Sequence, residues 1–201
     1  MPTSRLTLNG DIGGISVNST VTRTADGQIG HDVTLDPAKT GTLSTRTSDT
    51  EGTLTLESAH GLVDGDTIDV YWDGGRRYDV VVGTVAGDDV PISGGSGDAL
   101  PVQGTAVTAS KQQIIDTDFD GDLLEAIGAL CTARAHLGFY DTGALLALSL
   151  DLGASELWHW LNGGTAANPL AGKSIDYVVA TQAESTAEAN LKLGILYDST
   201  V

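Results

Sequence analysis

Short runs of alternating apolar and polar residues, each ended by a turn signal, constrain this chain more than any other feature. The clearest pair is "DTIDVYW" and "RRYDVVVGTV", joined by "DGG" at residues 73–75. A period of two places Ile68, Val70 and Trp72 on one face of a strand and Asp69 on the other. Asp-Gly is a typical tight-turn sequence, so these runs predict a β-hairpin. Similar runs recur along the chain, which indicates a mainly β fold.

Five of these runs fall within residues 49–109 and predict a small domain of their own. "TLTLES", "VPI" and "TAVTAS" accompany the hairpin, and five short strands over about sixty residues suit a small β-barrel. Residues 1–48 and 110–201 contain further alternating runs. We expect them to form one β-sandwich assembly domain, with the barrel inserted between two of its strands.

The stretch "DTDFDGDLLEAI" admits two interpretations. Asp116, Asp118 and Asp120 alternate like the ligands at the front of an EF-hand calcium loop. The twelfth position of that loop, which supplies a bidentate carboxylate, falls on Ile127, which coordinates nothing. We therefore expect no metal, and these three aspartates are the metal candidates that the sequence leaves open.

The second interpretation of that stretch is a helix start. Asp122 and Glu125 have the spacing of a capping box, and Leu123, Ile127 and Leu130 follow at helical spacing. The sequence thus predicts one helix over residues 122–136. We expect it to flank the sandwich.

The net charge of the chain limits its partners. There are 27 acidic residues against 10 Lys plus Arg, a net charge of −17. Proteins that hold the phosphate backbone need positive patches, so specific nucleic-acid binding is not expected. Nothing has the length of a membrane span, the start "MPTSRLTLNG" does not resemble a secretory signal, and one Cys131 excludes a disulfide framework. These features are typical of a protein made in a reducing cytoplasm.

No pattern of residues indicates catalysis. The four histidines have no metal-ligand spacing, and nucleophile-elbow, P-loop and dinucleotide-binding patterns do not occur. We expect a protein that is not an enzyme and has no cofactor.

Two pairs of side chains are candidate subunit contacts. Trp158 and Trp160 in "ELWHWL" share one face of a strand, where they form part of a core, a subunit contact or a sugar-stacking platform. Arg76 and Arg77 follow the hairpin turn, either as a charged edge that blocks strand pairing or as a contact to an acidic neighbouring subunit.

The segment "SAHGLVDGDTIDVYW", residues 58–72, resembles a segment of bacteriophage tail and other virion structural proteins. Its pattern is His-Gly-Leu, two residues, Gly-Asp and an alternating strand. The overall plan is similar to that of tail-tube proteins. This resemblance implies a β-sandwich with a flanking helix, stacked rings of identical subunits, inserted small β-domains and an acidic lumen along which DNA slides.

The resemblance leads to an expected function. The chain is expected to be a non-enzymatic structural protein of a phage-like particle, a self-assembling tail-tube component. It would form a homo-oligomer, contact other virion proteins and be located in the virion after assembly in the host bacterial cytoplasm, with no membrane partner. Two alternatives stay open: a capsid decoration protein, and a carbohydrate-binding or adhesive module that uses Trp158, Trp160 and the aspartates near Asp116.

Overall fold

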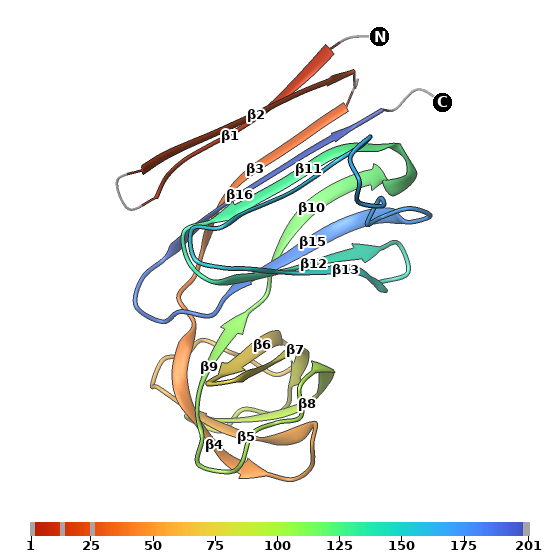
Figure 1. The fold of residues 1–201 in the computed structure, drawn as a ribbon. Coiled ribbons are helices and arrows are strands. Elements are labelled where there is room, and N and C mark those ends of the chain that lie inside the picture. Colours follow the sequence, from red (N-terminus) through yellow and green to blue (C-terminus); the bar gives the residue numbers. More distant parts are fainter. Residues whose placement is uncertain (1–2, 13–14, 25–26, 199–201) are drawn as a thin grey trace. The chain divides into compact units, whose positions relative to one another are not determined.

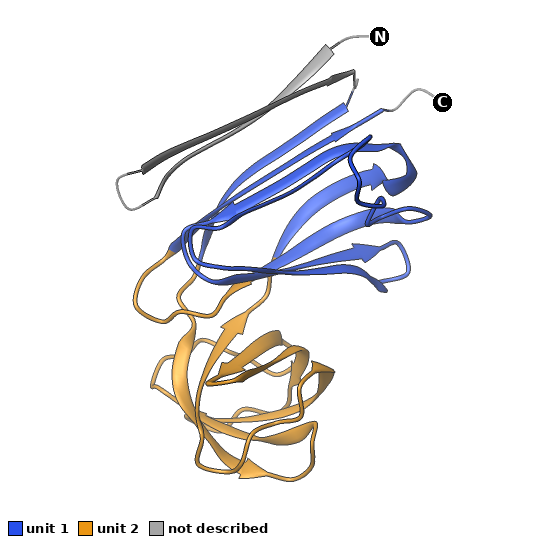
Figure 2. Cartoon of the chain, in the orientation of Figure 1, with its two compact units in different colours: residues 1–35, 114–180, 189–201 blue, residues 36–113, 181–188 orange. Residues whose placement is uncertain are grey.

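The computed structural model describes residues 3–12, 15–24 and 27–198, and this part of the chain is mainly β, as predicted. The chain divides into two compact units (Figure 2). One unit comprises Met1–Leu35, Ile114–Ala180 and Ala189–Val201, and the other comprises Asp36–Gln113 and Thr181–Glu188.

The second unit contains a closed six-stranded barrel, which confirms the predicted small barrel (Figure 1). Its strands are β4 (Lys39–Arg46), β5 (Glu51–Leu56), β6 (Thr67–Trp72), β7 (Gly75–Val82), β8 (Asp89–Gly97) and β9 (Ala106–Lys111). Around the barrel they follow the order β4-β5-β8-β7-β6-β9, and β4 pairs with both β5 and β9. The unit therefore begins at Asp36, before the predicted boundary at residue 49, because β4 is needed to close the ring of strands.

Alternation fills the barrel with aliphatic side chains. Leu54, Ile68, Val70 and Val80 are fully buried in one hydrophobic cluster, as their inward positions in the period-two pattern require. Asp69 lies between Ile68 and Val70 in the alternating pattern, on the other face of β6. It is nevertheless completely buried, and its carboxylate accepts hydrogen bonds from Gln112 Nε2 and Thr181 Oγ1.

The segment that resembles virion proteins forms the turns that lead into β6. Gly61 and Gly65 have φ values of +75° and +86°, a region that favours glycine. His60 is buried, with its Nε2 atom 3.1 Å from the Gly87 carbonyl oxygen and its Nδ1 atom accepting a hydrogen bond from the Leu62 amide. The histidine and glycines of this segment therefore have a structural role in the turns.

The first unit contains two four-stranded sheets (Figure 1). Their strands are β3 (Gly27–Leu35), β10 (Gln113–Asp120), β11 (Leu124–Cys131), β12 (Ala135–Asp141), β13 (Leu146–Leu152), β14 (Leu157–Leu161), β15 (Ser174–Gln182) and β16 (Ala189–Tyr197). One sheet has the order β10-β15-β12-β13 and the other β14-β11-β16-β3. Both sheets contribute side chains to one hydrophobic cluster, for example Phe119 and Val178 from the first and Ile127 and Leu193 from the second.

The prediction of a helix over residues 122–136 is wrong. This stretch begins with the 3-10 turn η1 (Gly121–Leu123) and continues as β11 and the start of β12. The apolar residues that fit helical spacing are also a nearly continuous run, which is typical of a strand buried on both faces. Ile127 and Ala129 face the main cluster, whereas Ala126 is buried against Leu196 on the other face. Pairing on both sides of β11 outweighs the local capping signal.

A third sheet consists of a hairpin near the N-terminus. β1 (Thr3–Ile12) and β2 (Ile15–Thr24) pair antiparallel along their whole length, from Thr3 opposite Thr24 to Ile12 opposite Ile15. Within the described residues these two strands form a two-stranded sheet that is separate from the other sheets.

Candidate functional site

An open groove of about 540 Å³ lies in the first unit, between the edge strands β3 and β10. Each of these strands stands at the end of its sheet, and β15 and β16 lie next to them. The residues that line the groove are Gln28, Ile29, His31, Asp116, Thr117, Asp118, Asp176 and Tyr197. They come from four strands that are far apart in the sequence.

The alternation of β10 explains its contribution to the groove. Thr117 points to the buried side between Ile115 and Phe119, whereas Asp116 and Asp118 are exposed. A period-two pattern with aspartates on one face of an edge strand keeps that face hydrated. Thr117 and the two aspartates therefore lie on opposite faces of β10, and all three residues border the groove.

Two buried polar atoms of the groove have no hydrogen-bond partner within the described structure: Nε2 of His31 and Oγ1 of Thr117. Thr117 is only 3% exposed. An unsatisfied buried hydroxyl costs about 1–3 kcal/mol, and such atoms are uncommon in folded proteins. These two atoms are therefore the least satisfied buried polar atoms of the groove lining.

An aromatic ring forms part of the apolar lining. Tyr197 pairs with Gly27 across the β16–β3 ladder, and a Cβ atom added to Gly27 would lie 2.3 Å from the tyrosine ring. The ring also packs against Phe119 of β10, with the centroids 6.2 Å apart. Glycine at position 27 thus allows the ring to lie against the β3 backbone.

The aspartates predicted as metal candidates occupy a strand and the turn that follows it. Asp116, Asp118 and Asp120 lie along β10, and Asp120 accepts a hydrogen bond from the Asp122 amide as the cap of η1. Asp122 in turn accepts a hydrogen bond from the Gly172 amide, at 2.6 Å. The stretch therefore has no EF-hand loop geometry. Among the described residues, no three His, Cys, Asp or Glu side chains are grouped to share a metal ion.

The two tryptophans of β14 pack toward the core. Trp160 is buried in the main cluster and its Nε1 atom donates to the Ala166 carbonyl oxygen, at 3.1 Å. Trp158 is half-buried and packs against the same cluster. This confirms the core interpretation for Trp160. Of the pair, only Trp158 keeps surface for a contact with another molecule.

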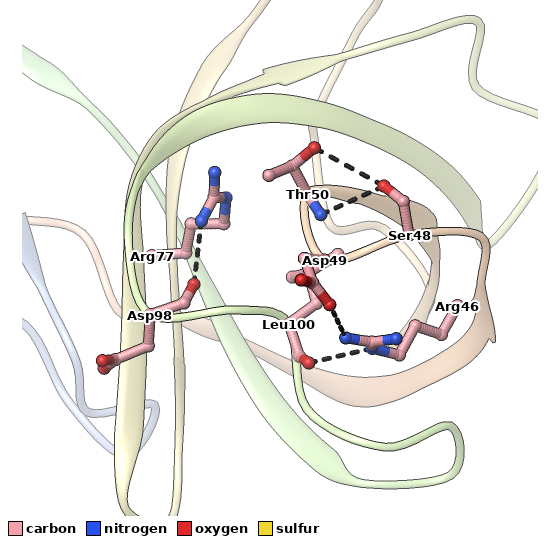
Figure 3. A network of polar contacts seen from close by, with 7 residues as sticks. All are labelled: Arg46, Ser48, Asp49, Thr50, Arg77, Asp98 and Leu100. Carbon is pink, nitrogen blue, oxygen red and sulfur yellow. Dashed lines mark hydrogen bonds and ion pairs between the residues drawn. The ribbon is translucent and has the colours of Figure 1, made fainter.

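The two arginines of β7 have different surroundings. Arg77 is 5% exposed and donates to three backbone carbonyl oxygens, those of Gly94, Asp98 and Gly95, at 2.6, 2.8 and 2.7 Å (Figure 3 shows its bond to Asp98). It holds the glycine-rich end of β8 in place. Arg76 is half-exposed, with its guanidinium carbon 6.0 Å from the Tyr78 ring centroid. A subunit contact through this pair therefore rests on Arg76.

Arg46 of β4 orders a neighbouring loop of the barrel. Arg46 forms an ion pair with Asp49, and its Nε atom donates to the Leu100 carbonyl oxygen at 3.0 Å (Figure 3). The Thr50 amide donates to the Ser48 hydroxyl in the same turn. These contacts join the β4–β5 turn to the segment after β8, so they have a structural role.

A buried carboxylate connects the barrel to the segment Thr181–Glu188. Asp69 accepts hydrogen bonds from the Asp79 amide, Gln112 Nε2 and Thr181 Oγ1, at 3.1, 3.0 and 2.6 Å. The Tyr71 hydroxyl lies 2.6 Å from the Thr181 hydroxyl. These bonds satisfy the carboxylate that the sequence had placed on the outside, and they explain its burial.

No protein-family model matches the chain, and neither a curated protein nor a solved structure matches it. The described part of the chain contains no helix with the length and apolar character that crossing a bilayer requires. The groove between β3 and β10 is the candidate site that the geometry of the described residues indicates. Sequence reasoning singled out Asp116 and Asp118 of the groove but not Asp176, His31, Thr117 or Tyr197.

Proposed function

We propose that this chain is a non-enzymatic structural protein of a phage-like particle that self-assembles as a tail-tube component. In this proposal the two four-stranded sheets form a β-sandwich assembly domain. The barrel is a small domain inserted into it.

The observation that supports the proposal is the number of strand edges that lack a neighbour. β10, β13, β14 and β3 end their sheets in the described structure, and the hairpin of β1 and β2 pairs only with itself. Unpaired strand edges readily add strands from another chain. Neighbouring copies of the chain are the simplest source of such strands.

The charge and the virion-like segment agree with this function. A net charge of −17 suits a ring whose inner surface repels DNA and lets it pass. The segment that resembles virion proteins has a structural role in the barrel turns, as expected for a part of a scaffold.

Negative-stain electron microscopy of the purified full chain, with light scattering at several concentrations, tests the proposal. Rings or tubes with a central hole are the expected result. A compact monomer at all concentrations would contradict self-assembly, and a stable trimer without a hole would favour a capsid decoration protein.

A further inference from the structure

We propose that Asn162 is a site of spontaneous covalent modification, at which the side-chain amide loses ammonia and becomes an aspartate or an isoaspartate. The site lies in the turn that follows β14. This inference goes beyond the proposed function and does not depend on it. It rests on the exposure of the turn, on the backbone amide of Gly163 and on the hydrogen bond between Asn162 and Glu125.

This deamidation needs only the chain and water. The Gly163 nitrogen gives up its proton to the solvent and attacks Cγ of Asn162, the bond from Cγ to Nδ2 breaks, and Nδ2 leaves with a proton as ammonia. The product is a five-membered succinimide ring. One water molecule then opens the ring at either carbonyl carbon, which gives aspartate or isoaspartate, and no atom is oxidised or reduced. A glycine in the following position favours ring closure because it has no Cβ atom to obstruct the approach.

The geometry of the turn leaves the attacking nitrogen available. Asn162, Gly163 and Gly164 are exposed. The Asn162 amide donates to the Glu125 carbonyl oxygen and the Gly164 amide to the Leu161 carbonyl oxygen, at 2.9 and 3.2 Å. The Gly163 amide, in contrast, has no hydrogen-bond partner among the described residues. Gly163 has a φ of +78°, and a Cβ atom added to it would meet nothing within 4 Å. The nucleophile of this turn is therefore exposed and not held by another group.

The structure distinguishes this site from the other asparagine–glycine pair of the chain. Asn9 is also followed by a glycine, but both residues lie inside β1, where they pair with Asn18 and Val17 of β2. Ring closure requires the backbone to leave the extended conformation, so a strand ladder must open before it reacts. Sequence alone makes the two pairs equivalent, and only the structure favours Asn162.

The remaining three asparagines are poorly suited to the reaction. Asn168 precedes Pro169, which has no N–H group to supply the attacking nitrogen. Asn18 and Asn190 lie in β2 and β16 and precede a serine and a leucine. These residues therefore serve as internal references within the same chain.

The modification changes the contact with Glu125. Asn162 Nδ2 donates to Glu125 Oε1, at 2.9 Å. A carboxylate at position 162 has no hydrogen to donate, and it places a second negative charge beside that of Glu125. The two residues stand where the β11–β14 ladder ends, next to the pair of Ala126 and Leu161. The reaction therefore replaces an attraction by a repulsion at the end of β14.

Peptide mapping by mass spectrometry tests the site directly. The full chain is kept in mildly alkaline buffer beside a synthetic peptide of residues 159–167, which gives the rate of the same sequence without the fold. We expect Asn162 to convert within about threefold of the peptide rate, and Asn9 about tenfold more slowly than Asn162.

Two results of this experiment would overturn the proposal. One is the absence of conversion at Asn162, or a rate more than about tenfold below that of the peptide, because the fold would then protect the residue. The other is equal conversion at Asn9 and Asn162, because the structure would then not select the site. Asn162→Gln is the control. Glutamine closes a larger ring far more slowly, so the signal of this peptide should disappear.

Two variants test the consequence for Glu125. Asn162→Asp reproduces one product, and we expect the melting temperature to fall by about 2 °C and the amides of residues 157–161 to exchange faster. Glu125→Gln in the same chain removes the repulsion and can donate to the new carboxylate, so it should restore both values. Unchanged stability and exchange in the single variant, or no recovery in the double variant, would contradict the role assigned to Glu125.

Discussion

The barrel and the two open sheets of this chain treat strand edges in opposite ways. Every barrel strand has a neighbour on both sides, because β4 and β9 close the ring. The other unit leaves β10, β13, β14 and β3 at sheet ends, within the described residues. The difference teaches that the barrel satisfies its own backbone. Among the described strands, those at the ends of the open sheets have backbone groups available for another chain.

Buried polar side chains are found in both units. In the barrel unit, Arg77 and Asp69 are both buried. Arg77 donates three hydrogen bonds, and Asp69 accepts three. Gln182 there is also buried, and its Nε2 atom donates to the Ala187 carbonyl oxygen. In the open unit, His31 Nε2 and Thr117 Oγ1 are buried without a hydrogen-bond partner among the described residues.

Removal of the buried guanidinium should have the largest effect on the self-sufficient barrel. Arg77→Met leaves the carbonyl groups of Gly94, Gly95 and Asp98 without their donor. We expect the free energy of unfolding of the barrel to fall by about 3 kcal/mol in urea titrations. Arg76→Met, at a half-exposed position, is the control and should cost about 0.5 kcal/mol. Equal losses in the two variants would show that the carbonyl contacts contribute little.

The next largest effect concerns the buried carboxylate. Asp69→Asn removes the charge that accepts from Asp79, Gln112 and Thr181, and one amide nitrogen must then face a donor. We expect a loss of about 2 kcal/mol, together with faster hydrogen exchange at residues 181–188. Asp73→Asn, on an exposed turn, should leave both unchanged. Unaltered exchange at residues 181–188 would mean that other contacts hold this segment.

A smaller effect compares two glycines of the open unit. Gly27→Ala places a Cβ atom against the Tyr197 ring and should cost about 1.5 kcal/mol, because the ring must move. Gly30→Ala, in the same strand, has nothing within 4 Å of the added atom and should be neutral or stabilising by about 0.5 kcal/mol. Thermal unfolding measures both. Identical effects would mean that the ring does not lie against β3.

The smallest effect is a pH dependence of the barrel. Burial tends to raise the pKa of Asp66, but the hydrogen bonds from Lys111 and the Val63 amide and the charge of Lys111, 2.6 Å away, outweigh it and lower the pKa. A lowered folded-state pKa stabilises the fold above the ordinary aspartate value and loses this contribution as the pH falls through the folded-state pKa. Asp66→Asn should therefore cost about 0.5 kcal/mol at pH 7 and nothing at low pH. A constant difference from pH 7 to pH 3 would exclude this origin.

The barrel was the part most accessible to sequence reasoning. Its strands are short, clearly alternating and separated by glycine turns, so the local signals and the final pairing agree. The predicted start of the barrel, at residue 49, was too late because it left out β4. The alternating sequence of β4, "KTGTLSTR", is compatible with a strand of either unit. Only the closure of the ring, a non-local pairing, assigns this strand to the barrel.

The errors in the other unit have a common physical cause. Burial on both faces gives β11 an apolar run that also fits helical spacing, and the aspartates on the exposed face of β10 have the spacing of calcium ligands. Local pattern cannot separate these cases, because pairing with distant strands decides them. In contrast, Leu191, Leu193 and Ile195 of β16 alternate along the strand and all belong to the main cluster, so local pattern and final pairing agree there.

The groove could not be assembled from the sequence. His31 and Thr117 belong to strands far apart in the chain, and their missing partners become visible only when β3 and β10 are placed at neighbouring sheet ends. The alternating aspartates were the one local signal of the site.

The pairing of β3 with β16 has a consequence for the order of folding during synthesis. β3 leaves the ribosome before the barrel strands, whereas its ladder partner β16 leaves after all other described strands. The six barrel strands emerge consecutively in between, so their ring can close on the nascent chain. The sheet that contains β3 must wait, with an unpaired strand, until translation of residues 189–197. Ribosome-bound chains stopped before β16 should therefore contain a finished barrel beside an unfinished sheet, the period in which chaperones have most to protect.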